Sequence, residues 1–167
     1  EMKDCYTLVL KSHIALSQVK FLKSSTGSNL DAIARYNLWQ YGLDYKHGTS
    51  HGIGFCLNVH EGPQRIAFKA NDTELEVGML LSNEPGVYLK DKFGIRLENS
   101  ILVKDYMKTE SGTFLQFETV SYIPFDRDML NLNLLDKKEI EWLNNYHKIT
   151  FELLSPYLSS EEKDWLY

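Results

Sequence analysis

The fold is indicated first by residues 94–103, which read Gly-Ile-Arg-Leu-Glu-Asn-Ser-Ile-Leu-Val. Apolar and polar side chains alternate along this stretch, and a period of two is typical of a strand with one polar face. Because side chains two positions apart lie on the same face of a strand, Arg96 and Glu98 are expected to point the same way. The stretch therefore predicts one continuous strand in a sheet.

The residues around this strand are rich in glycine. Nine of the ten glycines fall between Gly42 and Gly112, where they allow the backbone to turn tightly. A second β-rich run covers residues 114–123 and ends at Pro124, since proline cannot donate to a sheet. We expect strands and tight turns to dominate this part of the chain.

Helices are predicted on the N-terminal side of the glycine-rich part. Apolar residues follow helical spacing across residues 2–22, and the spacing is clearer in a second helix over residues 30–41. Ser28 is a suitable N-cap for the second helix, and Gly42 is a suitable residue to end it.

Two further helices are predicted on the C-terminal side. Asp136 and Glu139 form a capping-box pattern before an apolar helical stripe that runs to Pro156. A last short helix is expected to start at Ser159 or Ser160.

Composition and charge exclude several classes of protein. The chain has 167 residues, of which 43% are hydrophobic and 25% charged, with a net charge of −5. These values are typical of a globular domain and exclude a nucleic-acid module that works by phosphate neutralisation. The apolar runs are too short to cross a membrane. Cys5 and Cys56 form no paired motif, so we expect a cytoplasmic protein.

The first residue is Glu1 rather than methionine, and residues 2–22 read as an internal helix. We therefore expect the chain to be a piece of a longer protein.

Three of the five histidines lie close together in the glycine-rich part. His47, His51 and His60 fall within fourteen residues, and histidine serves both as a metal ligand and as a proton carrier near neutral pH. The spacing matches no common zinc motif, so a functional site and ordinary turn or core histidines are equally supported. His13 and His147 lie on predicted helices and are interpreted as packing residues.

Two glutamates lie beside apolar residues, where an unpaired charge is costly to bury. Glu84 precedes Pro85, which favours an extended backbone at the end of a strand. Glu98 could simply form a salt bridge with Arg96. Taken alone, each glutamate is more often solvated or paired than catalytic.

Four motifs together resemble the pita-bread metallopeptidases, and in particular the long form of the aminopeptidase P family. In chain order they are His47-Gly-Thr-Ser-His51-Gly-Ile-Gly, Asn58-Val-His60-Glu-Gly-Pro63, Asn83-Glu84-Pro85-Gly86-Val-Tyr88 and Gly94-Ile-Arg96-Leu-Glu98-Asn99. The segment Glu141-Trp-Leu-Asn-Asn-Tyr-His147 is similar to the C-terminal extension of the long form.

The resemblance implies a role for each of these residues. His51, Glu84 and Glu98 match metal ligands, with Glu98 bridging two ions and Glu84 also accepting a proton. His47 and His60 match histidines that bind substrate and carry protons, so the implied catalytic residues are His60, Glu84 and His47.

Two other residues match positions around the ligands, namely Tyr88 and Arg96, and Arg96 is expected to orient Glu98. The family also uses two aspartate ligands. These lie upstream of the first helix of this chain, so only three of five ligands are expected within it.

The implied fold is of the α+β class: the C-terminal half of a pita-bread domain, a curved antiparallel sheet with helices on its outer face, over residues 1–128. Residues 129–167 are expected to form a helical C-terminal extension packed on it. The sheet is expected to expose an apolar edge unless the missing half or another copy covers it.

The implied activity is release of the N-terminal residue from peptides with proline in the second position. Its cofactors are two divalent metal ions, with Mn²⁺ usual in the family and Zn²⁺ or Co²⁺ compatible with the ligands. The expected partners are a proline-containing peptide, the missing N-terminal part of the protein and a second copy in a homodimer, with no nucleic acid or membrane.

The isolated chain is expected to bind metal weakly and to be inactive. Two alternatives stay open. One is a prolidase or another pita-bread hydrolase, and the other is a pita-bread relative that has lost catalysis and serves as a binding or chaperone module.

Overall fold

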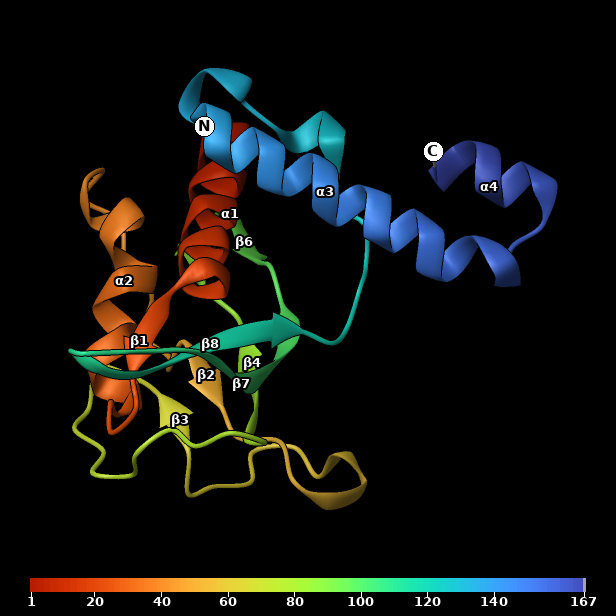
Figure 1. The fold of residues 1–167 in the computed structure, drawn as a ribbon. Helices are drawn as coiled ribbons and strands as arrows, with labels where there is room; N and C mark the ends of the chain where they lie inside the picture. Colours follow the sequence, from red (N-terminus) through yellow and green to blue (C-terminus); the bar gives the residue numbers. More distant parts are fainter. Residues whose placement is uncertain (167) are drawn as a thin grey trace.

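A four-stranded antiparallel sheet lies at the centre of this computed structural model, which describes residues 1–166. Its strands run in the order β1-β8-β7-β4 (Figure 1). Their bounds are Lys20–Leu22 for β1, Leu80–Asn83 for β4, Asn99–Thr109 for β7 and Gly112–Thr119 for β8. The antiparallel sheet confirms the predicted α+β class.

Two small antiparallel pairs complete the strands. Ser50–His51 (β2) pairs with Arg65–Ile66 (β3), and Gly86–Leu89 (β5) pairs with Phe93–Arg96 (β6). The prediction of one strand over residues 94–103 was therefore wrong, because β6 and β7 belong to different sheets. Leu97 and Glu98 form the link between them. The alternation of side chains continues through this link, so the pattern cannot reveal where the chain changes partner.

The helices are α1 (Met2–Gln18), α2 (Gly27–Trp39), α3 (Lys137–Leu154) and α4 (Ser160–Leu166). Short 3₁₀ turns cover Phe55–Leu57, Arg127–Met129, Leu132–Leu134 and Ser155–Tyr157. The capping box predicted for α3 is confirmed, with Asp136 accepting from the Glu139 amide at 2.9 Å. The predicted start of the last helix is confirmed too.

Two N-terminal predictions were wrong. The first helix ends at Gln18 rather than near residue 22, because Lys20–Leu22 forms β1 and pairs with β8. The second helix is capped by Thr26 rather than Ser28, since the side chain of Asn29 completes a capping box with Thr26. In both places a contact outside the helical pattern determines where the helix stops or starts.

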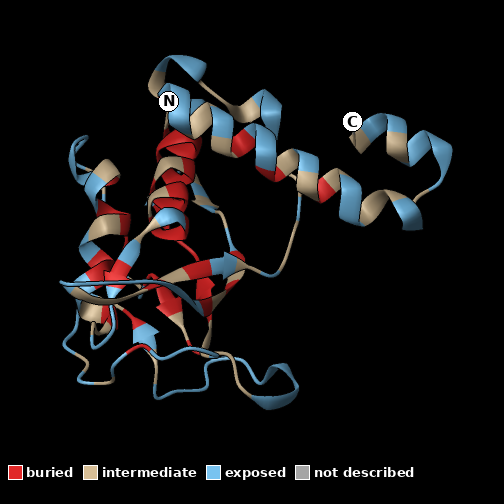
Figure 2. Ribbon diagram, in the orientation of Figure 1, coloured by how far each residue is buried: buried red, intermediate tan, exposed pale blue. Residues whose placement is uncertain are grey.

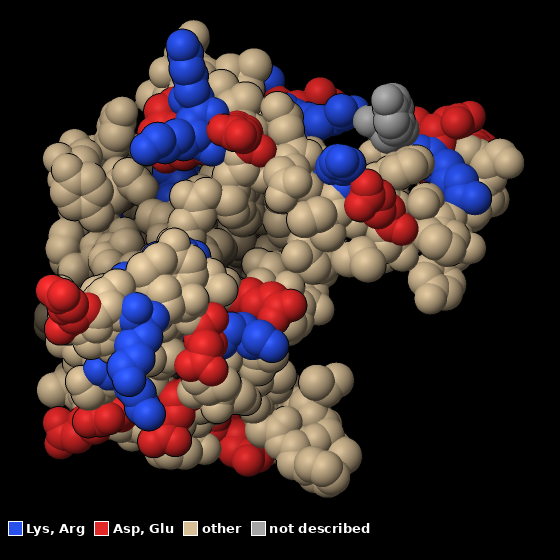
Figure 3. All heavy atoms as spheres, in the orientation of Figure 1, with Lys and Arg blue, Asp and Glu red and all other residues tan. Residues whose placement is uncertain are grey.

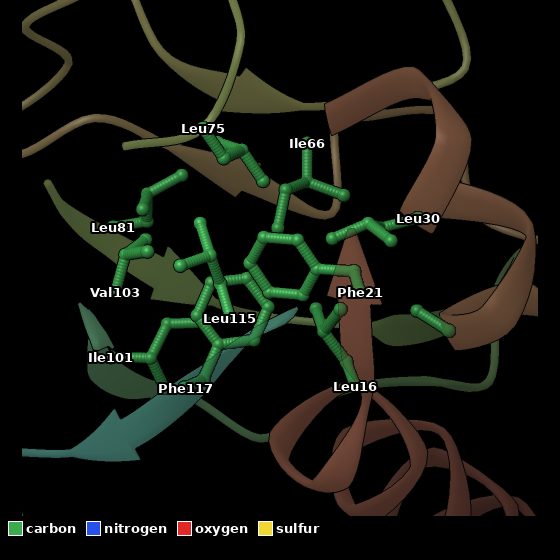
Figure 4. Close-up of a cluster of buried hydrophobic side chains, with 11 residues drawn as sticks. Leu16, Phe21, Leu30, Ile66, Leu75, Leu81, Ile101, Val103, Leu115 and Phe117 are labelled. Carbon is green, nitrogen blue, oxygen red and sulfur yellow. The ribbon is translucent and has the colours of Figure 1, made fainter. Parts of the chain in front are cut away.

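The main core lies between the sheet and the first two helices, and its buried side chains interlock around Phe21 and Phe117 (Figure 4). The cluster comprises Leu16, Phe21, Leu30, Ala34, Ile66, Leu75, Leu81, Ile101, Val103, Leu115 and Phe117. Side chains alternate across a sheet, so Leu81 and Asn83 of β4 face the helices while Ser82 faces the opposite side. This alternation separates the core from the functional residues.

Helix α1 is buried on most of its surface (Figure 2), because α2, the strands and α3 all pack against it. Leu10 and Ile14 of α1 share a cluster with Phe125, Leu143 and Tyr146. The first part of α3 therefore lies against α1, whereas α4 lies beyond the far end of α3 (Figure 1). The boundary between residues 128 and 129 stays a prediction.

The surface carries charges of both signs. Figure 3 shows acidic and basic side chains interspersed on one face of the molecule. Among the described residues, no helix combines the length and apolar character that crossing a bilayer requires.

Candidate metal centre

Three predicted ligands converge on one point. One ligand atom each from His51, Glu84 and Glu98 lies within 4.8 Å of the other two. His51 ends β2, Glu84 follows β4, and Glu98 lies between β6 and β7. Residues from three separate segments therefore form a single cluster of one imidazole and two carboxylates.

His51 is oriented by its own backbone neighbour. Its Nδ1 lies 2.9 Å from the Gly52 carbonyl oxygen, so this nitrogen carries the proton and donates. The lone pair is then on Nε2, which lies 3.5 Å from Glu84 Oε1. When one ring nitrogen donates a hydrogen bond to a carbonyl, the other nitrogen is unprotonated. This is the tautomer in which histidine binds a metal ion.

Glu84 is held on both carboxylate oxygens. Only 7% of the residue is exposed. The Ser82 hydroxyl donates to Oε1 at 2.8 Å, and the Arg96 guanidinium lies 3.4 Å from Oε2. Among the described residues Arg96 forms an ion pair with Glu84 and not with Glu98, so the alternative of an Arg96–Glu98 salt bridge was wrong. The expectation that Arg96 orients Glu98 stays a prediction. Because β6 and β7 separate at Leu97, Arg96 is directed toward Glu84.

The carboxylate of Glu98 is close enough to Glu84 for the two negative charges to repel each other. Glu98 is an exposed residue, yet partial desolvation of its carboxylate, and then the negative charge of Glu84, raise its pKa above the ordinary value, although Arg96, His51 and His47 oppose the shift. A cation between the two carboxylates would remove this repulsion. The donor set of two carboxylates and one imidazole fits a hard or borderline divalent ion.

A hydrogen-bonded chain joins His47 to the cluster. The His47 Nδ1 lies 2.7 Å from the Gly48 carbonyl oxygen, so Nδ1 donates there and Nε2 accepts from the Tyr88 hydroxyl at 2.9 Å. The Tyr88 oxygen in turn accepts from Arg96 Nε at 2.9 Å. Since Arg96 also reaches Glu84, the predicted residues His47, Tyr88 and Arg96 lie together beside the ligands.

His60 reaches the cluster from an exposed loop. Its ring meets His51 edge-on, with centroids 4.4 Å apart and planes at 86°. The residue has a positive φ of 60°, which is uncommon outside glycine and directs the loop back toward His51. All five histidine and glutamate residues predicted for the site are therefore in one region.

Sequence reasoning missed the group that supports His47. Arg35 and Asp31 of α2 form a buried ion pair at 2.6 Å. Arg35 also donates to the backbone carbonyls of Tyr45 and His47, at 2.8 and 2.9 Å, while Asp31 accepts from Thr49. The spacing of four residues between Asp31 and Arg35 on a predicted helix was a signal that could have indicated the pair.

Two family models match the chain. The model of metallopeptidase family M24 matches residues 1–105, and the model of the C-terminal region of this peptidase family matches residues 113–167. Both ranges include residues described above, since the first contains the ligand cluster and the second contains α3.

Curated relatives match almost the whole chain. Aminopeptidase P2 of Arabidopsis thaliana is 46% identical across 99% of this chain, and Xaa-Pro aminopeptidase 1 of Dictyostelium discoideum is 46% identical across 92%. These matches cover 24% and 25% of the two relatives. The chain thus spans about a quarter of their length.

Solved structures share the fold. The X-prolyl aminopeptidase of Caenorhabditis elegans, described as a cytosolic enzyme with a di-nuclear active site, has a TM-score of 0.89 and 38% identity, covering 99% of this chain and 28% of its own. The prolidase of Pyrococcus furiosus has a TM-score of 0.54 and 32% identity, covering 60% of this chain and 29% of its own.

Proposed function

The chain belongs to metallopeptidase family M24, and from this membership we propose that it forms one side of a dinuclear metal centre that releases the N-terminal residue from peptides with proline in the second position. The observation that carries the proposal is the convergence of His51, Glu84 and Glu98. The curated relatives, which are named as aminopeptidases P or Xaa-Pro aminopeptidases, support the substrate class.

Three side chains are too few to hold two divalent ions. His51, Glu84 and Glu98 bring two negative charges against four positive ones, so further anionic ligands are needed. We propose that two aspartates outside these 167 residues complete the centre. The carboxylate-rich donor set favours Mn²⁺, with Zn²⁺ and Co²⁺ as competitors. When bound, such ions polarise the scissile carbonyl and make water more acidic.

The residues of this chain have distinct tasks in the proposed reaction. The Glu84 carboxylate accepts the proton of the attacking water, and Ser82 and Arg96 keep it in place. The leaving nitrogen of an X-Pro bond must gain a proton, and His60, exposed beside His51, is positioned to supply it. Proton transfer by such a group contributes about 10² to 10⁴-fold in rate.

His47 has a different task in the same proposal. Its Nε2 accepts from Tyr88, which accepts from Arg96, so His47 supports the arginine that contacts Glu84. His47 is partly exposed and is therefore also available to bind substrate. We propose a cytosolic location, as described for the Caenorhabditis elegans enzyme. A homodimer stays a prediction from the sequence.

Metal titration of the 167-residue chain tests the proposal. We expect one weak Mn²⁺ site in calorimetry and no cleavage of Arg-Pro-Pro. Glu98→Gln should weaken the site strongly without removing all Mn²⁺ affinity, whereas Glu110→Gln, in the exposed turn between β7 and β8, should leave it unchanged. Two tight sites in this chain would contradict the proposed ligand division. The absence of any site would favour the binding-module alternative.

The substrate class needs a second experiment. A polypeptide of the relatives' full length that contains this chain should cleave Arg-Pro-Pro after arginine in the presence of Mn²⁺. Cleavage of only an Xaa-Pro dipeptide would instead support a prolidase, whose solved representative shares the fold. The variant Glu84→Gln should lower cleavage by several orders of magnitude, since it removes both a ligand and the proton acceptor.

A further inference from the structure

The sheet face opposite the ligand cluster carries two buried asparagines. Asn83 and Asn99 are paired residues of β4 and β7, with 0% and 3% of their surfaces exposed. Asn83 directly precedes Glu84, and Asn99 directly follows Glu98. Because side chains alternate along extended backbone, each asparagine points into the helix side while its neighbouring glutamate points to the ligand cluster.

The two asparagines are anchored to different helices. Asn83 Nδ2 donates at 3.0 Å both to the His13 carbonyl and to the Ser17 hydroxyl, which belong to α1. Asn99 Nδ2 instead donates at 3.0 Å to the hydroxyl of Tyr146, which belongs to α3. Asn83, the neighbour of Glu84, is therefore hydrogen-bonded to α1, and Asn99, the neighbour of Glu98, is hydrogen-bonded to α3.

The Tyr146 hydroxyl is fully engaged. It accepts from Asn99 Nδ2 and from the Ile123 amide at 3.1 Å, and it donates to the Ile123 carbonyl at 2.9 Å. A phenol has one proton to donate and can accept two hydrogen bonds, so this arrangement uses its full capacity. The ring is 3% exposed and is stacked on Trp142 with centroids 5.2 Å apart. Packing and hydrogen bonds thus hold Tyr146 in one position.

Glu98 depends on its backbone neighbours for its position. Among the described residues, only burial and surrounding charges act on its carboxylate, and no hydrogen bond reaches it. On one side, Leu97 packs into the core and its amide donates to the Pro85 carbonyl at 3.3 Å. On the other side, Asn99 is held by Tyr146 and by the Ser121 carbonyl at 2.7 Å.

We propose that Tyr146 is a positioning residue for Glu98 and acts through the side chain of Asn99. Helix α3 thereby controls the geometry of the metal centre from the opposite face of the sheet. This inference rests on the proposed function, because it assigns a role to Glu98 as a ligand. It places α3 in the functional unit, although α3 contributes no ligand.

Mn²⁺ titration of the Tyr146→Phe chain, followed by the electron paramagnetic resonance signal of free Mn²⁺, tests the inference. The ring and its stacking remain, and only the hydroxyl is lost. We expect the chain to stay folded and the dissociation constant to rise about tenfold, the lower end of the effect of groups that orient metal ligands. Asn99→Ala should produce at least the same rise.

The matched control is Tyr122→Phe. The Tyr122 ring contacts the Tyr146 ring at a tilt of 34°, with centroids 5.3 Å apart, and its hydroxyl lies outside the network that holds Asn99. This control should bind Mn²⁺ like the unchanged chain. All titrations are made at a temperature at which circular dichroism shows every variant to be folded.

A double-variant cycle separates positioning from a general loss of structure. In a Glu98→Ala background, Tyr146→Phe should cause no further change in the residual Mn²⁺ affinity, because the carboxylate that Tyr146 positions is absent. An equal loss in both backgrounds, or unchanged affinity of Tyr146→Phe alone, would overturn the inference while leaving the metal centre intact. Failure of the unchanged chain to bind Mn²⁺ at all would overturn both proposals.

Discussion

His51 and His13 show how environment determines what one side chain can do. His51 is partly exposed, donates through Nδ1 to Gly52 and presents Nε2 to two carboxylates. His13 is fully buried in α1, with its ring edge-on to Phe125 at 5.3 Å and to Trp142 at 6.2 Å. The first is available for a cation, whereas the second is restricted to its neutral form.

We predict that His13 makes the protein sensitive to acid. Burial lowers the pKa of His13 to about 3, whereas the unfolded chain takes up this proton near pH 6.5. The stabilising contribution is therefore complete above about pH 6.5 and is lost as the pH falls toward 3. The loss should reach about 1.4 kcal/mol per pH unit within this window.

Urea unfolding of the unchanged chain and of His13→Leu at several pH values measures this effect. Carboxylates contribute to the pH dependence of both proteins, so the difference between their slopes isolates His13. The slope between pH 6 and pH 4 should be smaller in His13→Leu. Parallel slopes would show that His13 is not the acid-sensitive group.

At the scale of elements, the loop that follows β2 determines where His60 lies. Gly52 O accepts from the Glu61 amide at 3.1 Å, which closes the loop. A Cβ placed on Gly52 would lie 1.9 Å from the Glu61 carbonyl oxygen, so only glycine allows this close approach. The loop thus returns to β2 and brings His60 against His51.

We therefore predict that Gly52→Ala displaces the loop. The added methyl group must move the Glu61 backbone, which should cost about 1–3 kcal/mol in unfolding free energy, the usual cost of overpacking. Gly62→Ala is the matched control, because the nearest atom to its Cβ is 4.0 Å away.

Chemical shifts of the His51 and His60 ring protons report the displacement. They should change in Gly52→Ala, because the edge-on contact between the two rings is lost, and they should be nearly unchanged in Gly62→Ala. Identical ring-proton shifts in Gly52→Ala and the unchanged chain would contradict this account of the loop.

At the scale of the whole molecule, α1 joins the parts of the fold. It contributes to all three hydrophobic clusters, through Leu16 in the first, Leu8 and Val9 in the second, and Leu10 and Ile14 in the third. The third cluster includes Leu143 and Tyr146 of α3. Lys11 of α1 also pairs with Glu139 of α3 at 2.5 Å.

Because one helix is shared by every cluster, we predict a single cooperative unfolding transition for the chain. Far-ultraviolet circular dichroism reports all helices. Tryptophan fluorescence responds mainly to Trp142 of α3, since Trp39 and Trp165 are 47% and 77% exposed. The two signals should give coincident curves in denaturant, the usual behaviour of small single domains. Two separated transitions would show that residues 129–167 unfold as an independent unit.

Local patterns were sufficient for part of this protein. The capping box of α3 and the start of α4 follow from residues within one or two turns of each other, because capping and helical spacing are local effects. The α+β class was implied by the family resemblance. The candidate site residues were found through four motifs whose order resembles one family. The histidine pattern alone left ordinary turn or core histidines equally open, and each glutamate alone favoured a solvated or paired side chain.

Tertiary structure alone decided the remaining features. The end of α1 and the separation of β6 from β7 depend on which distant strand each segment pairs with. The contact of Arg96 with Glu84 follows from that separation, as does the position of Glu98 between two sheets. Hydrogen bonds such as the one from Asn99 to Tyr146 join residues 47 positions apart. Periodicity describes only neighbours along the chain, so it contains no information about such pairs.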